Sequence, residues 1–456
     1  MQSAPIPAIR DGLRAAGVAV EVSPGPDGWQ APGSPPLAVV RPVDAAGVAA
    51  VLAMGRDEGF VVVPRGAGTQ DGWGLPPSRP FVVLDTRGLG GVVRYAPGDL
   101  TIRVGAGITL QQVDGLVRPH GQVLPLMPVG GPGATLGGVV AGDDGGPNRL
   151  AHGGPRDLTL GLHVLDGAGR AFVTGGNVVK NVSGLDIGKL FVGSFGTLGV
   201  LTEVSCKLRP CAARRAAWVG RWAQLAAAWP CAQEALSVAF RPVAAALVGA
   251  SRAAGAEAQA AVVVVFEGSN AEVEDQLVRL TALAAGATAT TVVGLDPGAW
   301  PGSDPDPVAT GPGWDVVSAA FAPLRVKDAF GVRCEVPDAA LEGLCGAVGG
   351  GMPQNSGGRA LPESGGARLV AWLGLGTLWY VHRQLATAAM PAAVRGLRAA
   401  AEERGGRAVV ARARGVAPGT IAPWGDAAGL LPWFRKIKAA FDPDGILSPG
   451  RFVGGL

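Results

Sequence analysis

The chain has 456 residues, 48% of them hydrophobic, and its formal net charge is only +3. This length predicts two or three domains with a large core, while the small charge, the lack of a basic run and an aromatic content of 5% argue against a nucleic-acid partner. The longest apolar run, around 258–266, is too short for a membrane helix, so we expect no membrane span.

The N-terminus has no early positive charge followed by an apolar segment, so we expect no secretory signal. The five cysteines are odd in number and form no C-x-x-C pair, which predicts neither a disulfide framework nor a metal or iron–sulfur site. Both observations favour a cytoplasmic location.

The first 210 residues combine a few helices with many short strands. Residues 6–16 are a possible helix, and Asp44 predicts the cap of a helix over 45–58 that Gly59 ends. Thr109 predicts the cap of another helix, which extends to Arg118. Strands are expected at 60–63, 81–84, 92–95, 100–104, 158–165, 170–174 and 200–208.

The pattern changes after Pro210, where Ala-rich helical segments alternate with isolated strands, as in an α+β region. Helices are expected at 215–228, 392–403 and 431–441. Strands are expected at 261–266, 331–336, 369–373 and 407–412, with irregular loops at 295–314 and 349–366.

The most informative stretch is Pro64-Arg65-Gly66-Ala67-Gly68-Thr69, which follows a predicted strand. Two glycines let successive N–H groups converge on one phosphate. In a nicotinamide-type loop a third glycine would stand at Asp71 and a helix would follow. Prolines and glycines in 70–80 exclude that helix. Asp85 stands where a ribose-binding acid is expected, but without the helix this position carries little weight.

Two further segments are rich in glycine. Residues 130–146 contain eight glycines but lack the G-K-[ST] of a P-loop, and Thr135 there predicts the cap of a short helix whose N-terminus faces an anion. In 193–203 glycines lead directly into a strand. Together, three such loops could supply backbone hydrogen-bond partners to all parts of an extended flavin nucleotide such as FAD.

Seven motifs together resemble flavoproteins of the vanillyl-alcohol oxidase/PCMH type, and within them the FAD-binding small subunit of bacterial glycolate oxidase. They are P-R-G-x-G-T at 64–69, A-T-L-G-G at 134–138, G-P-N-R-L at 146–150, R-D-L-x-L-G at 156–161, V-x-K-N-V-S-G at 178–184, G-T-L-G-V-L-T-E at 196–203 and F-D-P-D-G-I-L-S-P-G-R-F at 441–452. The resemblance covers most of the first 210 residues and the tail, and only loosely the part between them.

The resemblance implies an α+β fold, with a two-lobed PCMH-type FAD-binding domain and an α+β cap domain. The FAD-binding domain would span 36–210, in lobes of about 36–95 and 96–210. The cap, for substrate or for interaction, would span 211–415. An N-terminal segment, 1–35, precedes them, and a C-terminal segment, 416–456, returns to the FAD domain.

The resemblance also implies the residues that contact FAD. Those expected at the pyrophosphate are Pro64, Arg65, Gly66, Ala67, Gly68 and Thr69. Those expected along the flavin and ribityl side are Thr135, Gly138, Gly142 and Gly145, and those expected to give backbone contacts are Gly196, Gly199 and Val200. The loop at 64–69 has neither His nor Cys, so FAD is expected to be non-covalent.

The chain departs from the family in ways that bear on chemistry. It lacks the H-x-x-D-G-N-x-H metal motif of the catalytic large subunit and of D-lactate dehydrogenases, so no metal is expected. Leu185 replaces a tyrosine that is usual before Asp186, and Asp143 and Asp144 stand where relatives often carry Asn or Thr.

Oxidation of a 2-hydroxy acid needs a carboxylate anchor, a base for the hydroxyl proton and a close approach to the flavin. His152 is the best placed base, although a structural histidine is the commoner alternative. Lys180 is a candidate to stabilise the reduced flavin, or a solvated loop residue. Arg333 is a candidate carboxylate anchor, or an outward residue of its strand.

The other three histidines are assigned structural roles. His163 is expected in a packed strand, His120 at a helix C-terminus and His382 on the cap surface. Arg156 and Asp157 are expected to form an ion pair that orients their loop.

We therefore predict an FAD-dependent oxidoreductase subunit of a glycolate oxidase-like complex, acting on a small 2-hydroxy acid such as glycolate. It either oxidises the acid or relays its electrons between a second flavosubunit and an iron–sulfur subunit, which would make it peripheral to a membrane through those partners. Two alternatives stay open. One is a self-sufficient FAD-linked oxidase or dehydrogenase of another alcohol or hydroxy acid. The other is a non-catalytic structural subunit with a degenerate flavin fold.

Overall fold

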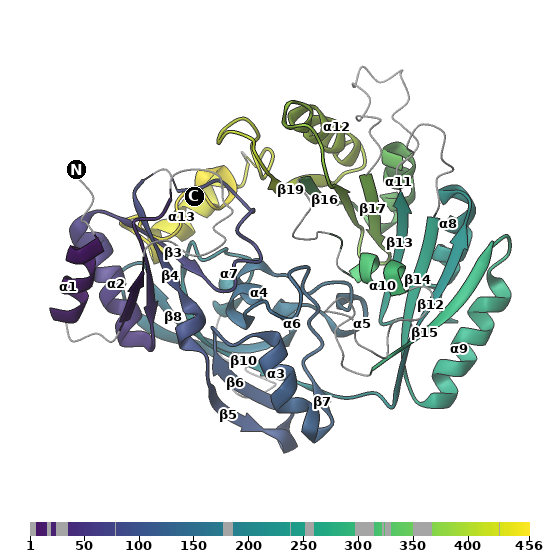
Figure 1. The fold of residues 1–456 in the computed structure, drawn as a ribbon, viewed down its shortest axis with the longest axis horizontal. Helices are drawn as coiled ribbons and strands as arrows, with labels where there is room; N and C mark the ends of the chain where they lie inside the picture. Colours follow the sequence, from purple (N-terminus) through teal and green to yellow (C-terminus); the bar gives the residue numbers. More distant parts are fainter. Residues whose placement is uncertain are drawn as a thin grey trace.

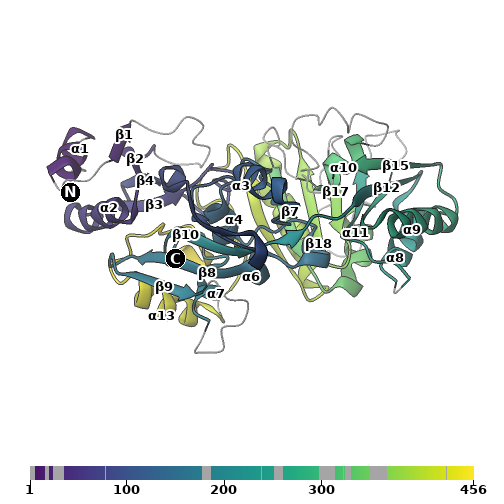
Figure 2. The same cartoon turned by 90° about the horizontal axis from the view of Figure 1, so that it is seen from below.

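The computed structural model describes residues 6–15, 20–23, 35–77, 79–176, 186–237, 239–250, 260–296, 314–321, 323, 330–349, 367–427 and 429–456. Three large sheets organise these residues. The cap sheet lies at one end of the molecule and the two smaller sheets lie at the other (Figures 1 and 2).

The first lobe is a four-stranded sheet in the order β1-β2-β4-β3. Its strands are β1 (Val20–Ser23), β2 (Ala38–Pro42), β3 (Val61–Arg65) and β4 (Phe81–Asp85). Helices α1 (Ile6–Ala15) and α2 (Ala45–Glu58) pack on it through a shared apolar core. The predicted bounds of α2 are confirmed: the Asp44 side chain accepts from the Gly47 N–H, and Gly59 ends the helix at a φ of 76°.

The second lobe is an antiparallel five-stranded sheet in the order β5-β6-β10-β8-β9. Its strands are β5 (Val92–Ala96), β6 (Thr101–Gly105), β8 (Thr159–Asp166), β9 (Ala171–Gly175) and β10 (Gly199–Lys207). Helices α3 (Leu110–Val117) and α4 (Leu136–Gly142) share a core with the sheet. The short helices α5 (Arg149–His152), α6 (Pro155–Leu158) and α7 (Gly188–Phe191) and the strand pair β7 (Gln122–Val123) and β11 (Arg209–Pro210) complete it.

Two details of the lobes differ from the expected boundaries. Strand β5, expected in the first lobe, pairs with β6 and so belongs to the second lobe. The N-terminal segment is also part of the first lobe, because β1 pairs with β2, and Ile9 and Leu13 of α1 are buried in its core.

The cap is an eight-stranded antiparallel sheet in the order β15-β12-β14-β13-β17-β18-β16-β19. Its strands are β12 (Arg214–Trp222), β13 (Ala244–Ala250), β14 (Ala260–Gly268), β15 (Ala289–Leu295), β16 (Phe330–Glu335), β17 (Ala367–Trp372), β18 (Thr377–His382) and β19 (Arg407–Ala413). Its helices are α8 (Leu225–Glu234), α9 (Asn270–Leu283), α10 (Trp314–Phe321), α11 (Leu341–Gly349) and α12 (Met390–Glu402). Four of them, α8, α9, α11 and α12, share the core on one face, and the other face packs on α10, Trp73 and Met127.

The helix predicted over 215–228 is wrong, because 214–222 forms β12 and α8 begins only at Leu225. The Ala-rich composition favours a helix. In the structure Ala216 and Trp218 face the helix-covered core, while Ala217 and Val219 face the opposite core. A strand buried on both faces lacks the polar alternation that would have identified it.

The C-terminal segment returns to the two N-terminal lobes. Helix α13 (Leu431–Phe441) has the predicted bounds, and the tail after it runs beside β3, where the Val62 N–H donates to the Ile446 carbonyl at 2.8 Å. The Lys438 ammonium donates to the Thr197 and Leu447 carbonyls, both at 2.7 Å, and pairs with Asp442 at 2.6 Å. This buried cation ties the tail to the third glycine segment.

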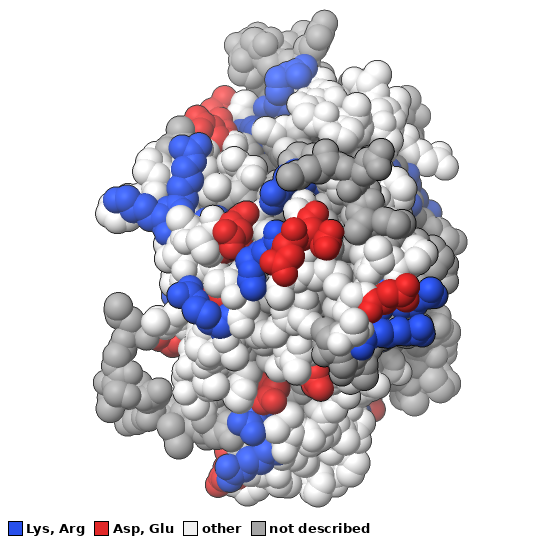
Figure 3. Space-filling model, turned by 90° about the vertical axis from the view of Figure 1, so that its left-hand side faces the viewer, with Lys and Arg blue, Asp and Glu red and all other residues white. Residues whose placement is uncertain are grey.

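On the face shown in Figure 3, cationic and anionic side chains are scattered and often adjacent, with broad uncharged areas between them. That face carries no extended basic surface of the kind that binds nucleic acid. Among the helices in the described ranges, none has the length and apolar character needed to cross a bilayer.

Candidate functional site

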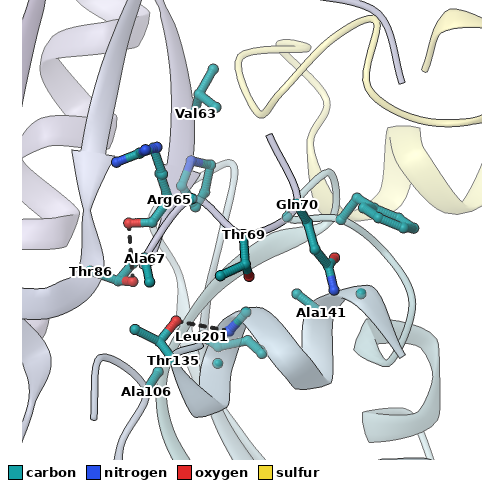
Figure 4. Close-up of a pocket in the computed structure, with 18 of the residues that line it drawn as sticks. Val63, Arg65, Ala67, Thr69, Gln70, Thr86, Ala106, Thr135, Ala141 and Leu201 are labelled. Carbon is teal, nitrogen blue, oxygen red and sulfur yellow. Dashed lines mark hydrogen bonds between the residues drawn. The ribbon is translucent and has the colours of Figure 1, made fainter. Parts of the chain in front are cut away.

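A cleft opens where β3 ends, between the two lobes and the C-terminal tail (Figure 4). Its walls come from the loop after β3, from α4, from the 195–201 segment and from Arg451. It holds about 780 Å³ of space, including the part open to solvent.

The loop over residues 64–70 leaves backbone donors for a ligand. Within the described part of the chain, the N–H groups of residues 67–70 donate to no other residue. Gly68 has a φ of 76°, in the left-handed region that glycine adopts without strain. Successive amides released from the sheet ladder form an anion-binding cradle, so the loop fits a pyrophosphate.

Glycine is required here because other groups approach the backbone closely. A Cβ on Gly66 would lie 1.9 Å from Thr135 Oγ1, and one on Gly142 would lie 1.9 Å from Gln70 Oε1. Gln70 also donates to Asp144 Oδ2 at 3.3 Å. The first glycine segment thus packs directly on the second.

Two arginines hold the shape of the loop. Arg65 pairs with Asp71 at 2.9 Å, with both side chains 9% exposed. Arg451, from the tail, donates to the carbonyls of Asp71 at 2.8 Å and Gln70 at 3.1 Å. Burial raises the pKa of Asp71 above its usual value, and the charges of Arg65 and Arg451 oppose that shift.

Thr135 caps α4, because its hydroxyl accepts from the Gly138 N–H at 3.4 Å. The N-terminus of α4 was expected to face an anion, but the structure gives its first donors other partners. The Leu136 N–H donates to the Ile108 carbonyl and the Gly137 N–H to the Ala106 carbonyl, both at 2.8 Å. The anion-binding donors are therefore those of the 67–70 loop.

Asp85 is held by its own arginines. Arg41 and Arg87 both pair with it, at 2.9 Å and 2.7 Å. Burial would raise the pKa of Asp85, but the hydrogen bonds from Arg87 and Arg41 outweigh burial and hold the pKa below its usual value. Asp85 does not line the cleft, which agrees with our reading of the sequence that its position is weak evidence for ribose binding.

Eleven of the thirteen residues expected to contact the cofactor line the cleft. They are Pro64, Arg65, Gly66, Ala67, Gly68, Thr69, Thr135, Gly138, Gly142, Gly196 and Gly199. The other two do not line it: Val200 is buried in the core of the first lobe, and Gly145 lies against Pro155 and Gly154.

Sequence reasoning missed ten of the residues that line the cleft. They are Val63, Gln70, Asp71, Thr86, Ala106, Gly137, Ala141, Phe195, Leu201 and Arg451. Several are direct neighbours of predicted glycines, which is a signal that could have found them. Arg451 lies in the quoted C-terminal motif, and only the return of the tail places it in the cleft.

His152 lies at the boundary between the second lobe and the cap, outside the lining of the cleft. Its Nε2 lies 2.7 Å from Glu267 Oε1 of β14, and its Nδ1 is buried without a partner in the described part of the chain. Burial would raise the pKa of Glu267, but the hydrogen bond with His152 and the charge of Arg215 lower it overall. This geometry fits a residue that joins the two domains.

Arg333 faces Trp73, in the loop after β3. Its guanidinium lies 4.8 Å from the ring centroid of Trp73, and it pairs with Glu335 at 3.0 Å. It does not line the cleft. Lys180 and the motif at 178–184 lie outside the described residues.

The remaining histidines lie away from the cleft. His382 was expected on the cap surface, which is wrong: it ends β18 with 1% exposure, because both neighbouring strands pair with it there. His163 is on β8, partly exposed rather than packed in a core, and lies 3.5 Å from Glu203. His120 ends a short 3-10 helix and packs against Tyr95.

In the described ranges, no group of three or more His, Cys, Asp or Glu side chains could hold a metal ion.

We expected an ion pair between Arg156 and Asp157, but the structure does not show one. Instead, the Asp157 carboxylate accepts a hydrogen bond from the Gly154 N–H at 2.8 Å. Its carboxylate thus caps the start of α6.

Comparison with known proteins finds similar sequences for two parts of this chain. Residues 36–175 match the family described as "FAD binding domain", and residues 426–452 match "FAD linked oxidases, C-terminal domain". The glycolate oxidase subunit GlcE of Escherichia coli is 44% identical over 128 residues, which is 28% of this chain and 37% of GlcE.

Two further relatives match a similar region. D-lactate dehydrogenase of Archaeoglobus fulgidus is 34% identical over 200 residues, 42% of this chain and 45% of that protein. Glycolate oxidase subunit GlcD of Bacillus subtilis is 33% identical over 177 residues, 39% of this chain and 38% of GlcD. The chain thus spans less than half the length of these curated relatives.

A solved structure of alkyldihydroxyacetonephosphate synthase superposes with a TM-score of 0.63 at 15% identity. The match covers 91% of this chain and 76% of that one. The predicted fold class, an FAD-binding domain of two lobes with an α+β cap, is confirmed at the level of the fold.

Proposed function

We propose that this chain, which carries the FAD binding domain of the PCMH-type flavoproteins and the C-terminal segment of the FAD-linked oxidases, oxidises a small 2-hydroxy acid to the 2-oxo acid. The relatives named as glycolate oxidase subunits and D-lactate dehydrogenase support this substrate class. When bound, FAD would supply the two-electron acceptor for that oxidation.

The observation that carries the proposal is the row of unpaired amides at residues 67–70, which faces a cleft formed by three glycine segments. These amides would hold the pyrophosphate. Thr135, Gly138 and Gly142 would border the rest of the cofactor, and Gly196 and Gly199 would contact it through their backbone. Arg65 and Arg451 would keep the loop in place and add positive charge.

The chain's own residues leave the proton acceptor open. None of the four histidines, all within the described ranges, lines the cleft. A histidine base for the hydroxyl proton would therefore have to come from a partner. Relay of electrons between a second flavosubunit and an iron–sulfur subunit is the variant that needs no proton acceptor on this chain.

The partners and the location are part of this proposal. The names of GlcE and GlcD as subunits support a complex. Four of the five cysteines are buried and none is in a disulfide, and no group of three or more His, Cys, Asp or Glu in the described ranges could hold a metal, so an iron–sulfur cluster would belong to another chain. We place the complex in the cytoplasm, peripheral to the membrane through its partners.

The test begins with the absorbance spectrum of the purified full chain. We expect a flavin spectrum, and release of the flavin on denaturation because attachment is non-covalent. A colourless protein that takes up no added FAD would contradict the proposal and favour a structural role. Anaerobic mixing with glycolate or D-lactate then separates the remaining variants: bleaching of the isolated chain indicates that it reacts with the acid itself, and bleaching only with partners indicates relay.

A further inference from the structure

Gln70 ends the loop over residues 64–70, and its side chain reaches away from that loop. The side chain extends toward the last turn of α4, near Ala141 (Figure 4). It lies so close to Gly142 that a Cβ there would be 1.9 Å from Gln70 Oε1 and 2.4 Å from Nε2. Gln70 and Gly142 both line the cleft. The Gln70 amide therefore covers a part of α4 that we assign to the flavin and ribityl side.

The end of α4 brings a carboxylate to this amide. Helix α4 ends at Gly142, and Asp143 follows in the left-handed region with a φ of 48°. This turn places Asp144 beside Gln70, whose Nε2 donates to Asp144 Oδ2 at 3.3 Å. The Val129 N–H donates to the same carboxylate, at 3.0 Å from Oδ2 and 3.1 Å from Oδ1. Asp144 is thus held by the backbone on one side and holds Gln70 on the other.

The ionised carboxylate fixes the orientation of the Gln70 amide. It has no hydrogen to donate, so the nitrogen end of the amide must face Asp144 and the oxygen end must face elsewhere. Burial raises the pKa of Asp144, and the Val129 N–H and the charge of Arg333 oppose that shift. Among the described residues, none donates to Gln70 Oε1. This oxygen is therefore an acceptor left for a ligand in the cleft.

The pair of Gln70 and Asp144 lies outside the motifs by which the chain resembles the PCMH-type flavoproteins. The phosphate motif P-R-G-x-G-T ends at Thr69, and Asp144 stands where relatives often carry Asn or Thr. Asn and Thr each offer a donor as well as an acceptor, so they would accept the amide in either orientation. An aspartate at this position is what gives Gln70 a single orientation.

The Gln70 side chain lies at the end of the cleft nearest the cap. Phe195, which also lines the cleft, donates through its N–H to the Ala141 carbonyl at 2.8 Å. Its ring lies 5.7 Å from that of Trp73, which in turn meets Trp379 of β18 at 6.4 Å. The two halves of FAD lie on opposite sides of its pyrophosphate. The reacting half must be the one that a substrate can approach closely, between the lobes and the cap.

From the Gln70 amide, its carboxylate partner and their place beside the cap, we propose that Gln70 contacts the isoalloxazine ring of FAD and that Asp144 positions Gln70 for this contact. The inference rests on the proposed function and adds two residues to its site. Gln70 Oε1 accepts a hydrogen bond from a ring N–H, and Asp144 keeps the amide in the orientation that this bond needs. The charge of Asp144 also lowers the midpoint potential of the flavin, because it disfavours added electrons on the ring.

The first test measures the dissociation constants of the purified full chain for FAD and for ADP, which carries the adenosine and pyrophosphate but no flavin. Gln70→Met keeps the length of the side chain and removes both polar atoms. We expect it to weaken FAD binding about fivefold, since a neutral hydrogen bond contributes on that scale, and to change ADP binding by less than about twofold. Equal weakening for FAD and ADP would overturn the inference, because it would place the Gln70 side chain at the pyrophosphate.

A double-mutant cycle tests whether Asp144 acts through Gln70. Asp144→Asn keeps an acceptor for the Val129 N–H but no longer fixes the amide. We expect it to weaken FAD binding by up to about fivefold alone and to add nothing in the Gln70→Met background. Asp143→Asn is the matched control, because it removes a neighbouring charge that pairs with Arg149 at 2.7 Å. Its effect should be the same with and without Gln70, and coupling as large as that of Asp144 would overturn the positioning role.

The midpoint potential of the bound flavin is a readout that a merely structural role would not move. Asp144→Asn should raise it, because the variant removes a negative charge beside the ring. An unchanged potential together with an additive cycle would overturn the role of Asp144. Unfolding in urea reports whether each variant folds. Should Asp144→Asn not fold, the comparison of FAD with ADP in Gln70→Met still decides whether Gln70 contacts the flavin.

The same measurements separate this inference from the proposed function. A wild-type chain that binds no FAD contradicts both. A chain that binds FAD and oxidises a 2-hydroxy acid, but whose Gln70→Met variant loses affinity for FAD and ADP alike, contradicts this inference alone. A chain that shows the expected loss for FAD only, but that no 2-hydroxy acid bleaches even with its partners, contradicts the proposed function alone.

Discussion

The substitution Gly66→Ala tests the contact between the phosphate loop and α4. The new Cβ would lie 1.9 Å from Thr135 Oγ1 and 3.0 Å from its Cβ and Cγ2. The φ of Gly66 is not in the left-handed region, so the cost comes from the clash alone. Overpacking of this kind costs about 1–3 kcal/mol. Turning Thr135 away would remove its cap on Gly138, worth about 1 kcal/mol.

The assay measures the dissociation constant for FAD and the free energy of unfolding in urea. We expect Gly66→Ala to lower the free energy of unfolding by about 1–3 kcal/mol, because the clash is between protein atoms, and to weaken FAD binding as far as the loop is displaced. Thr135→Ala alone should cost about 1 kcal/mol of stability. Because it also removes the atoms that clash, the double variant should cost less than the sum of the two.

Gly133→Ala is the control, because a Cβ at Gly133 meets no atom within 4 Å. It should change neither measurement by more than about 0.5 kcal/mol. Strict additivity of the Gly66 and Thr135 substitutions, or a Gly66→Ala protein with unchanged stability, would refute the packing argument.

Three further predictions concern the supports of the site and the thiols. Arg451→Met removes two charged hydrogen bonds to loop carbonyls and should weaken FAD binding about tenfold or more, as measured by fluorescence titration. An unchanged affinity would show that the loop keeps its conformation without Arg451. The pKa of Asp85 is lower in the folded protein, so its contribution to stability is full above about pH 4 and is lost as the pH falls through the folded pKa. Asp85→Asn should therefore lower the free energy of unfolding in urea at neutral pH and make it fall less steeply as the pH is lowered. An unchanged pH dependence would contradict this. Burial raises the pKa of Cys231 to about 11 and that of three other thiols, Cys206, Cys334 and Cys345, to about 12. In the native protein at about pH 8, we therefore expect only Cys211 to react readily with a thiol reagent. Fast reaction of several thiols would contradict the burial of the other four.

Local signals predicted those parts of the structure that short segments determine. The bounds of α2 follow from a cap and a left-handed glycine that are both visible in sequence. The loop after β3 was predictable because a close backbone approach requires glycine. Such positions keep the same conformation wherever the rest of the chain lies.

The missed features depend on contacts between distant segments. Strand β12 was mistaken for a helix because its alanines contact two cores, which only the finished sheet provides. His382 carries no local mark of burial, and its exposure of 1% follows from pairing with strands on both sides. In β19, Val410 lies opposite Val332 and Arg412 lies opposite Gly331, and this bulge is a mismatch between two strands that has no signature in either one.

The C-terminal tail shows why the cleft cannot be understood from its glycine motifs alone. Glycines permit close approach but do not hold three separate segments together. That task falls to two buried cations of the tail: Arg451 binds the carbonyls of the first segment, and Lys438 binds the Thr197 carbonyl of the third. Burial lowers the pKa of Lys438, and Asp442 opposes the shift. A buried charge is tolerated only when it is paired and hydrogen-bonded. The tail therefore links the first and third segments, and the first segment contacts the second through Gln70 and Asp144.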